Sequence, residues 1–298
     1  MSKRVLKELS KLYNQQNKRP LLENDYIISF DSDLDNVKVL VKLPEDSVYR
    51  FKFIRLNLKI PEDYPYSPPI VSFVNHDSVR IHPNMYEDGK CCATILNTWG
   101  DNKYEKWTSS MNIETVIISF MSFFDNDPYS HEPGDKGDDT YTIYVLYQSW
   151  YSCYIRYLQR EQDSLFRDYL EQYLVANFQE IIEYLEILQE HYTTDFYYTK
   201  CFDIMWYKID FENIIKKLNK FNRELTIQEP IELEEPIQEP IEKAPKCSIC
   251  IDTHRLYDPI FFIKFSCNHE FHRVCMKTHE NLCPVCRNEL TQDDLALL

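Results

Sequence analysis

The spacing of apolar residues predicts a helix near the start of the chain and a group of short strands after it. Residues 3–14 carry apolar side chains at helical intervals between Lys and Glu, which is typical of an amphipathic helix. Four later segments are short, rich in β-branched and aromatic residues, and separated by turn-forming residues. They are residues 26–30, 37–43, 50–59 and 70–74. This order indicates an α+β fold with a four-stranded antiparallel sheet.

The pattern changes beyond the strands. Closely spaced prolines over 61–69 favour an extended crossing, because proline fits neither a helix interior nor a central strand. Residues 112–124 are apolar enough to form a buried central helix. From about 141 to 225 we find no strand signal, and apolar residues recur every three or four positions. We expect three or four helices there, most clearly over 165–192.

A segment rich in Glu and Pro follows the predicted helices. It repeats Ile-Gln-Glu-Pro-Ile-Glu at 227–232 and 237–242, and it cannot bury enough apolar surface to fold alone. At about 3.1 Å per residue when extended, a linker of this length reaches up to about 60 Å. The predicted units are a core over 1–160, a helical extension over 161–225, the linker over 226–245 and a cysteine-rich module over 246–292.

Charge and hydropathy narrow the class of partner. The net charge of −15 argues against nucleic acid and against anionic membranes, both of which require clustered Lys and Arg, so we expect protein partners. No uninterrupted apolar run approaches the roughly 18 residues of a membrane span, and the first residues lack the apolar centre of a signal peptide. We therefore expect an intracellular protein, cytoplasmic or nuclear or both.

Six of the ten cysteines lie close together in paired spacings interleaved with histidines. In a chain without a secretory signal this pattern favours zinc over disulfides. Eight ligands fill two tetrahedral sites, and sites closed by protein ligands are structural rather than catalytic. The candidate ligands are Cys247, Cys250, Cys267, His269, His272, Cys275, Cys283 and Cys286.

A second chemical motif lies between the predicted sheet and the central helix. Asn84 ends the tripeptide His82-Pro83-Asn84, and Cys92 follows it by eight residues, directly after Cys91. A thiolate attacks a thioester carbonyl, and a lysine amine can attack the product without any cofactor. Such a site needs an exposed thiol, a donor for the developing oxyanion and a group that orients the amine. Asn84 and Asp127 are the candidates for the last two tasks.

With the proline-rich crossing, Trp107 and Asp127-Pro128, this motif resembles the catalytic segment of ubiquitin-conjugating enzymes. The resemblance implies the UBC fold, with Cys92 as the acceptor of the tag and Asn84 stabilising the oxyanion or the loop above it. Asp127 would position the substrate lysine, and Cys91 would be a small apolar filler. Residues 89–99 and 127–134 are similar to enlarged members of the family that carry extra helices after the core.

The cysteine–histidine array resembles a RING domain, whose ligand pairs alternate between two metals. One zinc would be held by Cys247, Cys250, His272 and Cys275, and the other by Cys267, His269, Cys283 and Cys286. The resemblance also implies partner contacts. In the RING these are Ile249 and Arg287, and in the conjugating domain, where RING ligases dock, Arg4 and Tyr66. The bulky tryptophan often found between the sixth and seventh ligands is absent.

These resemblances imply a conjugating enzyme fused to its own RING ligase. Cys92 would accept ubiquitin or a ubiquitin-like protein from an activating enzyme, which alone uses ATP, and would transfer it to the lysines of protein substrates. The alternative is a catalytically silent scaffold whose RING serves only to recruit proteins. Few Gly and many Ile, Asn, Lys and Tyr hint at an AT-rich genome, such as that of a virus or parasite acting in a host cell.

Overall fold

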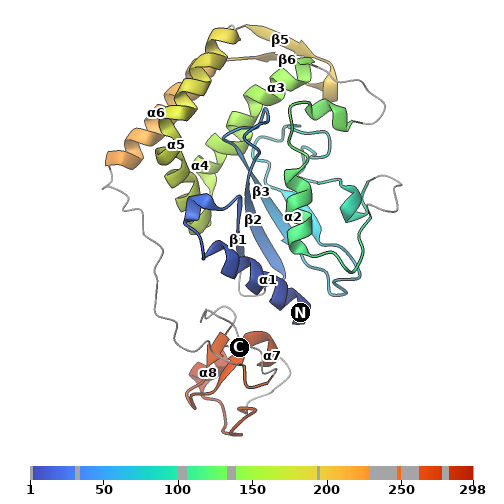
Figure 1. The fold of residues 1–298 in the computed structure, drawn as a ribbon, viewed down its shortest axis with the longest axis vertical. Coiled ribbons are helices and arrows are strands. Elements are labelled where there is room, and N and C mark those ends of the chain that lie inside the picture. The colour runs from blue at the N-terminus through green and yellow to red at the C-terminus, as the bar shows by residue number, and fades with distance from the viewer. Residues whose placement is uncertain are drawn as a thin grey trace.

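The computed structural model describes residues 3–30, 34–99, 106–132, 139–192, 195–227, 247–249, 262–276 and 282–297. Its centre is an antiparallel sheet in sequential strand order, formed by β1 (Tyr26–Phe30), β2 (Asn36–Lys42), β3 (Phe53–Lys59) and β4 (Ile70–Phe73) (Figure 1). Helix α1 (Lys3–Gln16) precedes the sheet and α2 (Ile113–Met121) follows it. The predicted α+β arrangement of helix, four-stranded sheet and central helix is confirmed.

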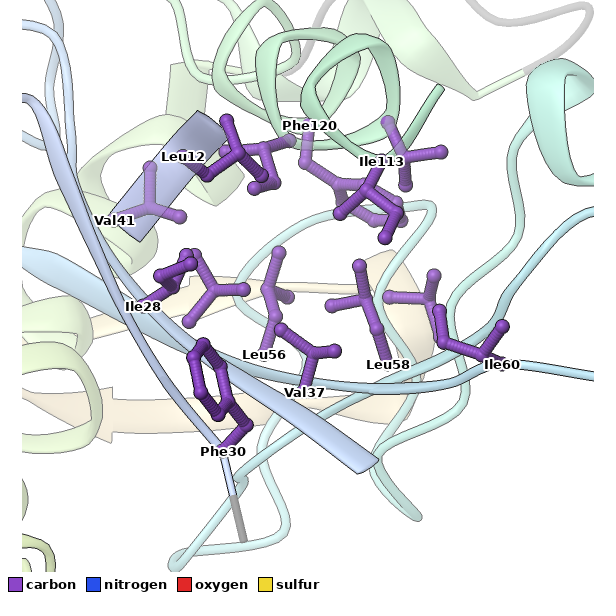
Figure 2. Packing of buried hydrophobic residues seen from close by; sticks show 14 of the residues in the cluster. Leu12, Ile28, Phe30, Val37, Val41, Leu56, Leu58, Ile60, Ile113 and Phe120 are labelled. Carbon is purple, nitrogen blue, oxygen red and sulfur yellow. The ribbon is translucent and has the colours of Figure 1, made fainter. Parts of the chain in front are cut away.

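Side chains alternate strictly between the two faces of the sheet. In β2, Val37, Val39 and Val41 belong to the apolar cluster under α1 and α2, whereas Leu40 belongs to a second cluster on the other face. This alternation follows from the two-residue period of a strand. Figure 2 shows how the strands and the two helices interdigitate on the first face. The side chains labelled there are Leu12, Ile28, Phe30, Val37, Val41, Leu56, Leu58, Ile60, Ile113 and Phe120.

The second face of the sheet is covered by a helical layer. It consists of α3 (Asp139–Trp150), a π-helical segment (Tyr151–Ile155), α4 (Arg156–Arg160) and α5 (Ser164–His191). Phe53 of β3 packs its ring against those of Tyr169 and Tyr173, with centroids 5.7 and 5.0 Å away. Both faces of the sheet are therefore buried, which explains the apolar residues at consecutive strand positions.

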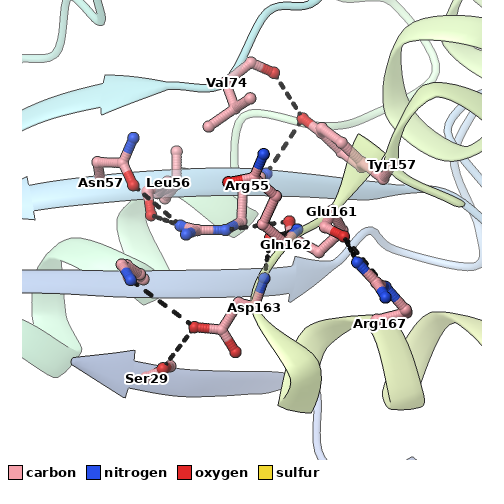
Figure 3. Close-up of polar contacts among 11 residues, drawn as sticks. Ser29, Arg55, Leu56, Asn57, Val74, Tyr157, Glu161, Gln162, Asp163 and Arg167 are labelled. Carbon is pink, nitrogen blue, oxygen red and sulfur yellow. Dashed lines mark hydrogen bonds and ion pairs between the residues drawn. The ribbon is translucent and has the colours of Figure 1, made fainter. Parts of the chain in front are cut away.

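A polar network also ties the sheet to this layer (Figure 3). The nearly buried Arg55 of β3 pairs with Glu161, with 3.4 Å between Nε and Oε2. The hydroxyl of Tyr157 accepts the N–H of Arg55 and donates to the carbonyl of Val74 at 2.9 Å. Burial lowers the pKa of Arg55, and Glu161 opposes that shift. Because removing one partner of a buried pair leaves an uncompensated charge, this network fixes the position of the helical layer.

One part of the expected helical region forms strands instead. Residues 196–208 contain a hairpin of β5 (Phe196–Thr199) and β6 (Met205–Lys208), and α6 (Phe211–Ile227) follows it. The prediction that strand signals are absent beyond residue 141 is wrong here. Both strands are short and aromatic, and aromatic residues suit a half-buried pleated surface better than they suit a helix.

The cysteine-rich module contains short elements only. They are β7 (Phe262–Lys264) paired with β8 (Glu270–His272), α7 (Arg273–Met276) and α8 (Gln292–Ala296). Residues 226–227 of the predicted linker belong to α6, and the rest of the linker lies outside the described residues. In the described part of the chain, no helix combines the length and apolar character needed to cross a membrane.

One lysine lies entirely inside the fold, just before β3. Lys52 is 0% exposed, its Nζ donates to the carbonyl of Val48 at 2.9 Å, and it lies 4.5 Å from the centre of the Trp150 ring. Among the described residues no carboxylate pairs with it. Burial lowers the pKa of Lys52 to about 7.

Replacing this lysine by an apolar side chain of similar length should stabilise the protein in a pH-dependent way. Between pH 7 and 10.5 the unfolded chain binds the Lys52 proton and the native chain does not, so native stability rises with pH; below pH 7 both bind it. We expect Lys52→Met to raise stability near neutral pH by up to about 4 kcal/mol, at about 1.36 kcal/mol per pKa unit. Thermal unfolding should show this gain shrinking toward pH 10.

Lys59→Met, which replaces an exposed lysine at the end of β3, is the matched control and should change stability little at any pH. A Lys52→Met gain that does not vary with pH would contradict the lowered pKa.

Candidate active site and metal cluster

The segment carrying His82-Pro83-Asn84 and the cysteine pair is held against strand β4. Phe73 donates its N–H to the carbonyl of Gly89 at 2.8 Å, and Ser72 forms a bridge with Lys90. Gly89 has φ +86°, and a Cβ at this position would lie 2.7 Å from the carbonyl oxygen of Phe73. Only glycine fits this close approach, so the sequence at residue 89 sets the path of the loop that follows.

Asn84 and Cys92 form a reciprocal pair of hydrogen bonds. The N–H of Cys92 donates to the carbonyl of Asn84 at 2.8 Å, and the amide Nδ2 of Asn84 donates to the carbonyl of Cys92 at 2.9 Å. The spacing of eight residues therefore corresponds to a closed loop whose two ends lie side by side. The Asn84 amide is consequently fixed next to the residue predicted to carry the thioester.

The buried His82 joins this loop to the segment after α2. It is 0% exposed, its Nδ1 accepts the N–H of Asn84 at 3.1 Å, and its Nε2 lies 3.0 Å from the carbonyl of Phe123. These partners require a neutral ring that carries its proton on Nε2. Burial, aided by His131, lowers the pKa of His82 to about 3. The imidazole is therefore a fixed hydrogen-bonding group in the structure of the loop.

The two adjacent cysteines lie in different surroundings. Cys91 belongs to the core cluster under α1 and α2, and burial raises the pKa of its thiol far above the usual value. A thiol that stays protonated is a poor nucleophile. Cys92 belongs to neither apolar cluster of the described residues. The sequence predicts an exposed thiol at Cys92, whereas the residue is only 4% exposed in the structure. Hydrogen bonds to Asn84 hold its backbone N–H and carbonyl.

Asp127 lies at the start of a second loop, before the short helix η3 (Pro128–His131). Its side chain is exposed, and its N–H donates to Oδ1 of Asp125 at 2.9 Å. The other oxygen of Asp125 lies 3.0 Å from Nε2 of His131, whose ring centroid is 4.8 Å from that of His82. This chain of contacts fixes the loop of Asp127 relative to the loop of Asn84.

Trp107 joins the proline-rich crossing to the segment after Cys92. Its indole Nε1 donates to the carbonyl of Pro65 at 2.8 Å, and its backbone N–H donates to the side chain of Asn97 at 3.1 Å. The ring also packs on Tyr64, with 5.8 Å between centroids. The residues of the family motif that are distant in sequence are thus joined in space.

The predicted partner contacts differ in their availability. Tyr66 is 82% exposed, but the guanidinium of Arg4 donates to the carbonyls of Ser109 and Met111 at 2.6 Å each and pairs with Glu8. Arg4 therefore joins α1 to the segment before α2 and uses several of its donors within the chain. In the cysteine-rich module, Ile249 is partly buried, and the exposed Arg287 adopts φ 59° in a tight turn.

Four of the predicted zinc ligands converge on one point. The ligand atoms of Cys267, His269, Cys283 and Cys286 all lie within 4.8 Å of one another. Two thiolates bound about 2.3 Å from a tetrahedral zinc ion would lie about 3.8 Å apart, so this soft donor set fits a structural zinc. Backbone turns over 265–269 and 283–288 present the four side chains.

The turn that carries Cys267 is also fastened to the last helix. Asp294 accepts hydrogen bonds from the N–H and the hydroxyl of Ser266, both at 2.7 Å, and forms a capping box with Thr291. The Ser266 hydroxyl is the main cause that lowers the pKa of Asp294 to about 2. The carboxylate thus stays ionised and holds the cluster loop in place.

The second predicted ligand set is only partly described. Cys247 and Cys275 are buried, Cys250 lies outside the described residues, and so does the side chain of His272. The pairing of these four residues stays a prediction.

The sequence did not single out Arg80, which contacts the active-site loop directly. Its Nη2 donates to the carbonyl of Pro83 at 2.7 Å, and its guanidinium stacks on the rings of Tyr86 and Phe202. The sequence signal for this contact was an arginine two residues before His82. Its stacking partner Phe202 could not be foreseen, because it is distant in sequence and lies in the hairpin that was not predicted.

The comparisons with known proteins agree with this geometry. Residues 4–146 match the protein family described as ubiquitin-conjugating enzyme. The probable ubiquitin-conjugating enzyme protein 17 of Caenorhabditis elegans is 31% identical over 211 residues, which are 65% of this chain and 28% of that protein. Ubiquitin-conjugating enzyme E2 Z of Danio rerio is 33% identical over 111 residues, which are 37% of this chain and 33% of that protein.

The human dual E2 ubiquitin-conjugating enzyme/E3 ubiquitin-protein ligase BIRC6 is 40% identical over 105 residues, covering 34% of this chain and 2% of that protein. A solved structure of human ubiquitin-conjugating enzyme E2 G1 is 27% identical, covers 41% of this chain and 95% of its own, and has a TM-score of 0.33. The chain spans a third or less of the length of the three curated relatives. Residues 4–146 therefore form a ubiquitin-conjugating domain, and the relatives of this chain are ubiquitin-conjugating enzymes.

Proposed function

We propose that the protein is an active ubiquitin-conjugating enzyme that carries ubiquitin or a ubiquitin-like protein as a thioester on Cys92. The observation that carries this proposal is the reciprocal hydrogen-bond pair, which fixes the Asn84 amide 2.9 Å from the carbonyl of Cys92. The exclusion of Cys91 supports the assignment, since the pKa of its thiol is raised by burial.

The chemistry consists of two acyl transfers. First, the Cys92 thiolate attacks the thioester carbonyl of the tag on an activating enzyme, a new S–C bond forms, and the thiolate of the activating enzyme leaves. Then a substrate lysine, as the free amine, attacks the same carbonyl carbon. The C–N bond forms, the amine loses a proton to solvent, and the Cys92 thiolate leaves. Neither step needs a cofactor on this chain, because ATP is used only by the activating enzyme.

Asn84 and Asp127 serve the second transfer. Each amide NH2 has two donors, and one N–H of Asn84 is used by the carbonyl of Cys92. The other is available to stabilise the oxyanion or to order the loop above it. Asp127 is exposed on the adjoining loop. Its carboxylate orients the incoming lysine ammonium and assists the loss of the proton that gives the free amine.

We further propose that the cysteine-rich module is a RING with two structural zinc ions that promotes discharge of Cys92. The cluster of Cys267, His269, Cys283 and Cys286 supports this proposal. A RING accelerates transfer by restraining the tethered tag in a reactive pose, and a linker reaching up to about 60 Å would allow the module to approach its own active site.

One observation favours the silent-scaffold alternative. Cys92 is only 4% exposed, whereas a carrier thiol must reach two successive partners. If the alternative holds, the residues around Cys92 preserve the shape of the loop, and the cysteine-rich module recruits proteins without transfer.

Charging of the protein separates the two functions. With an activating enzyme, ATP and ubiquitin, we expect an adduct on a non-reducing gel that thiol reductant removes. The adduct should persist in Cys91→Ser and be absent in Cys92→Ala, because only Cys92 lies next to the Asn84 amide. Absence of any adduct with several activating enzymes and ubiquitin-like proteins would support the scaffold instead.

Removal of the Asn84 amide should slow discharge of the charged protein. We expect Asn84→Ala to lower the rate of transfer to free lysine by about 10²–10³, the usual loss for one oxyanion donor, in a single-turnover assay. Asn75→Ala is the matched control, because Asn75 also bonds loop carbonyls, those of Val79 and Glu87, at 2.9 and 3.1 Å. Equal slowing in both variants would show that only the loop structure matters.

Disruption of the metal cluster should reduce both zinc content and discharge. We expect Cys283→Ser to lose one of two zinc ions per chain, measured by elemental analysis, because a structural site needs all four ligands. Its discharge rate should approach that of the chain lacking residues 246–298. If the discharge rate constant of the unmodified protein does not depend on its concentration, the cysteine-rich module acts on the Cys92 of its own chain. Unchanged discharge in both proteins would refute ligase activity toward its own conjugating domain.

A further inference from the structure

The turn of the β5–β6 hairpin has an unusual backbone. Phe202 has φ 50° and ψ 34°, and Asp203 and Met205 have φ of 56° and 64°. Side chains other than glycine rarely adopt this left-handed region, and for a bulky aromatic residue it is an outlier. Such strain persists only where surrounding contacts hold it, and it is concentrated at functional sites. The contacts of Phe202 therefore indicate what the turn does.

Phe202 lies at the junction of three segments. Its ring centroid is 5.8 Å from that of Tyr129 and 5.2 Å from that of Tyr141, in edge-to-face arrangements. Tyr129 follows Asp127 by two residues in the second active-site loop. Tyr141, at the start of α3, also packs on Tyr129 at 5.5 Å. One side chain of the hairpin is thus in contact with the loop that carries Asp127.

The Phe202 ring also contacts Arg80. The guanidinium carbon of Arg80 lies 4.4 Å from the centre of the Phe202 ring and 3.8 Å from that of Tyr86. Arg80 donates to the carbonyl of Pro83 at 2.7 Å, and its own carbonyl accepts the hydroxyl of Tyr141 at 3.0 Å. Phe202 therefore reaches the residue before Asn84 through one intermediate side chain.

The hairpin itself is anchored away from the two loops. Tyr207 donates its hydroxyl to the carbonyl of Thr140 at 2.7 Å, and its ring lies 5.2 Å from that of Tyr144. Thr199, at the base of the turn, is buried. Because β6 is fixed on α3, the position of Phe202 depends on the helical layer as well as on the active-site loops that it contacts.

We propose that Phe202 and Arg80 are positioning residues that set the relative placement of the Asn84 and Asp127 loops for transfer to lysine. The inference rests on the proposed function of Cys92. The helical layer, through the β5–β6 hairpin, thus limits the movement of the two active-site loops relative to each other. The strained turn is retained because it directs an aromatic ring to the point where the two loops meet.

The test compares variants of the full chain in single-turnover discharge to saturating free lysine, starting from charged protein. Phe202→Gly removes the ring and introduces glycine, the residue best suited to φ 50°. The unfolding temperature of this variant should therefore stay near that of the unmodified protein. Its discharge rate should fall by about tenfold to 100-fold, as expected for misplaced reacting groups. Phe202→Tyr, which retains the ring, should discharge within about twofold of the unmodified protein.

Phe196→Ala is the matched control, because it removes a 65% exposed ring from the same hairpin. Arg80→Lys keeps the charge but loses the planar stack, so it should slow discharge as well. Combined with Phe202→Gly, it should slow discharge by less than the product of the two single effects, because the two side chains share one contact.

Adduct formation and discharge rate test the role of Cys92 and the role of Phe202 separately. If the unmodified protein forms no adduct, the proposed function fails, and this inference fails with it. If the adduct forms but Phe202→Gly discharges at the unmodified rate, or if Phe196→Ala is slowed equally, only the positioning role is overturned. Should Phe202→Gly unfold, Arg80→Lys alone decides: a normal discharge rate for it overturns the positioning role.

Discussion

Burial of both faces of the four-stranded sheet is the constraint on which the rest of the structure depends. One face packs under α1 and α2, and the other packs under the layer of α3 to α5. The second contact is fastened by polar groups as well as apolar ones, since Arg55 of β3 pairs with Glu161 at 3.4 Å. With both faces fixed, the segments that leave β4 and α2 emerge at defined positions, and these segments carry the candidate active site.

The active-site loop is then shaped by groups that are neutral and buried. His82 keeps one proton on its ring, since burial lowers its pKa to about 3, and it joins the backbone of Asn84 to that of Phe123. Gly89 permits an approach to β4 that a Cβ at 2.7 Å from the Phe73 carbonyl would prevent. In the loop held by these two residues, Asn84 and Cys92 form their reciprocal bonds. The arrangement is preorganised, which suits a site that stabilises charge during reaction.

The sequence predicted the parts of the fold that depend on local periodicity. The strands were found because β1 and β2 alternate or run apolar over short stretches, and α1 because its apolar residues recur at helical spacing. The hairpin was missed because four-residue strands within a region of helical spacing give little periodic signal. The motif spacing singled out Asn84 and Cys92, which the fold brings together, and four ligand candidates whose ligand atoms lie within 4.8 Å of one another. It could not reveal the burial of Cys92, the internal bonds of Arg4 or the stacking of Arg80 on Phe202, because each depends on residues distant in the chain.

The central claim is that one of two adjacent cysteines carries an activated protein tag. Intact-mass analysis of the charged protein, followed by peptide mapping under conditions that preserve thioesters, tests it most directly. The account predicts a mass increase of one tag per chain, reversed by thiol reductant, with the tag attached to Cys92. A tag on Cys91, or no mass increase with any activating enzyme and ubiquitin-like protein, would contradict it.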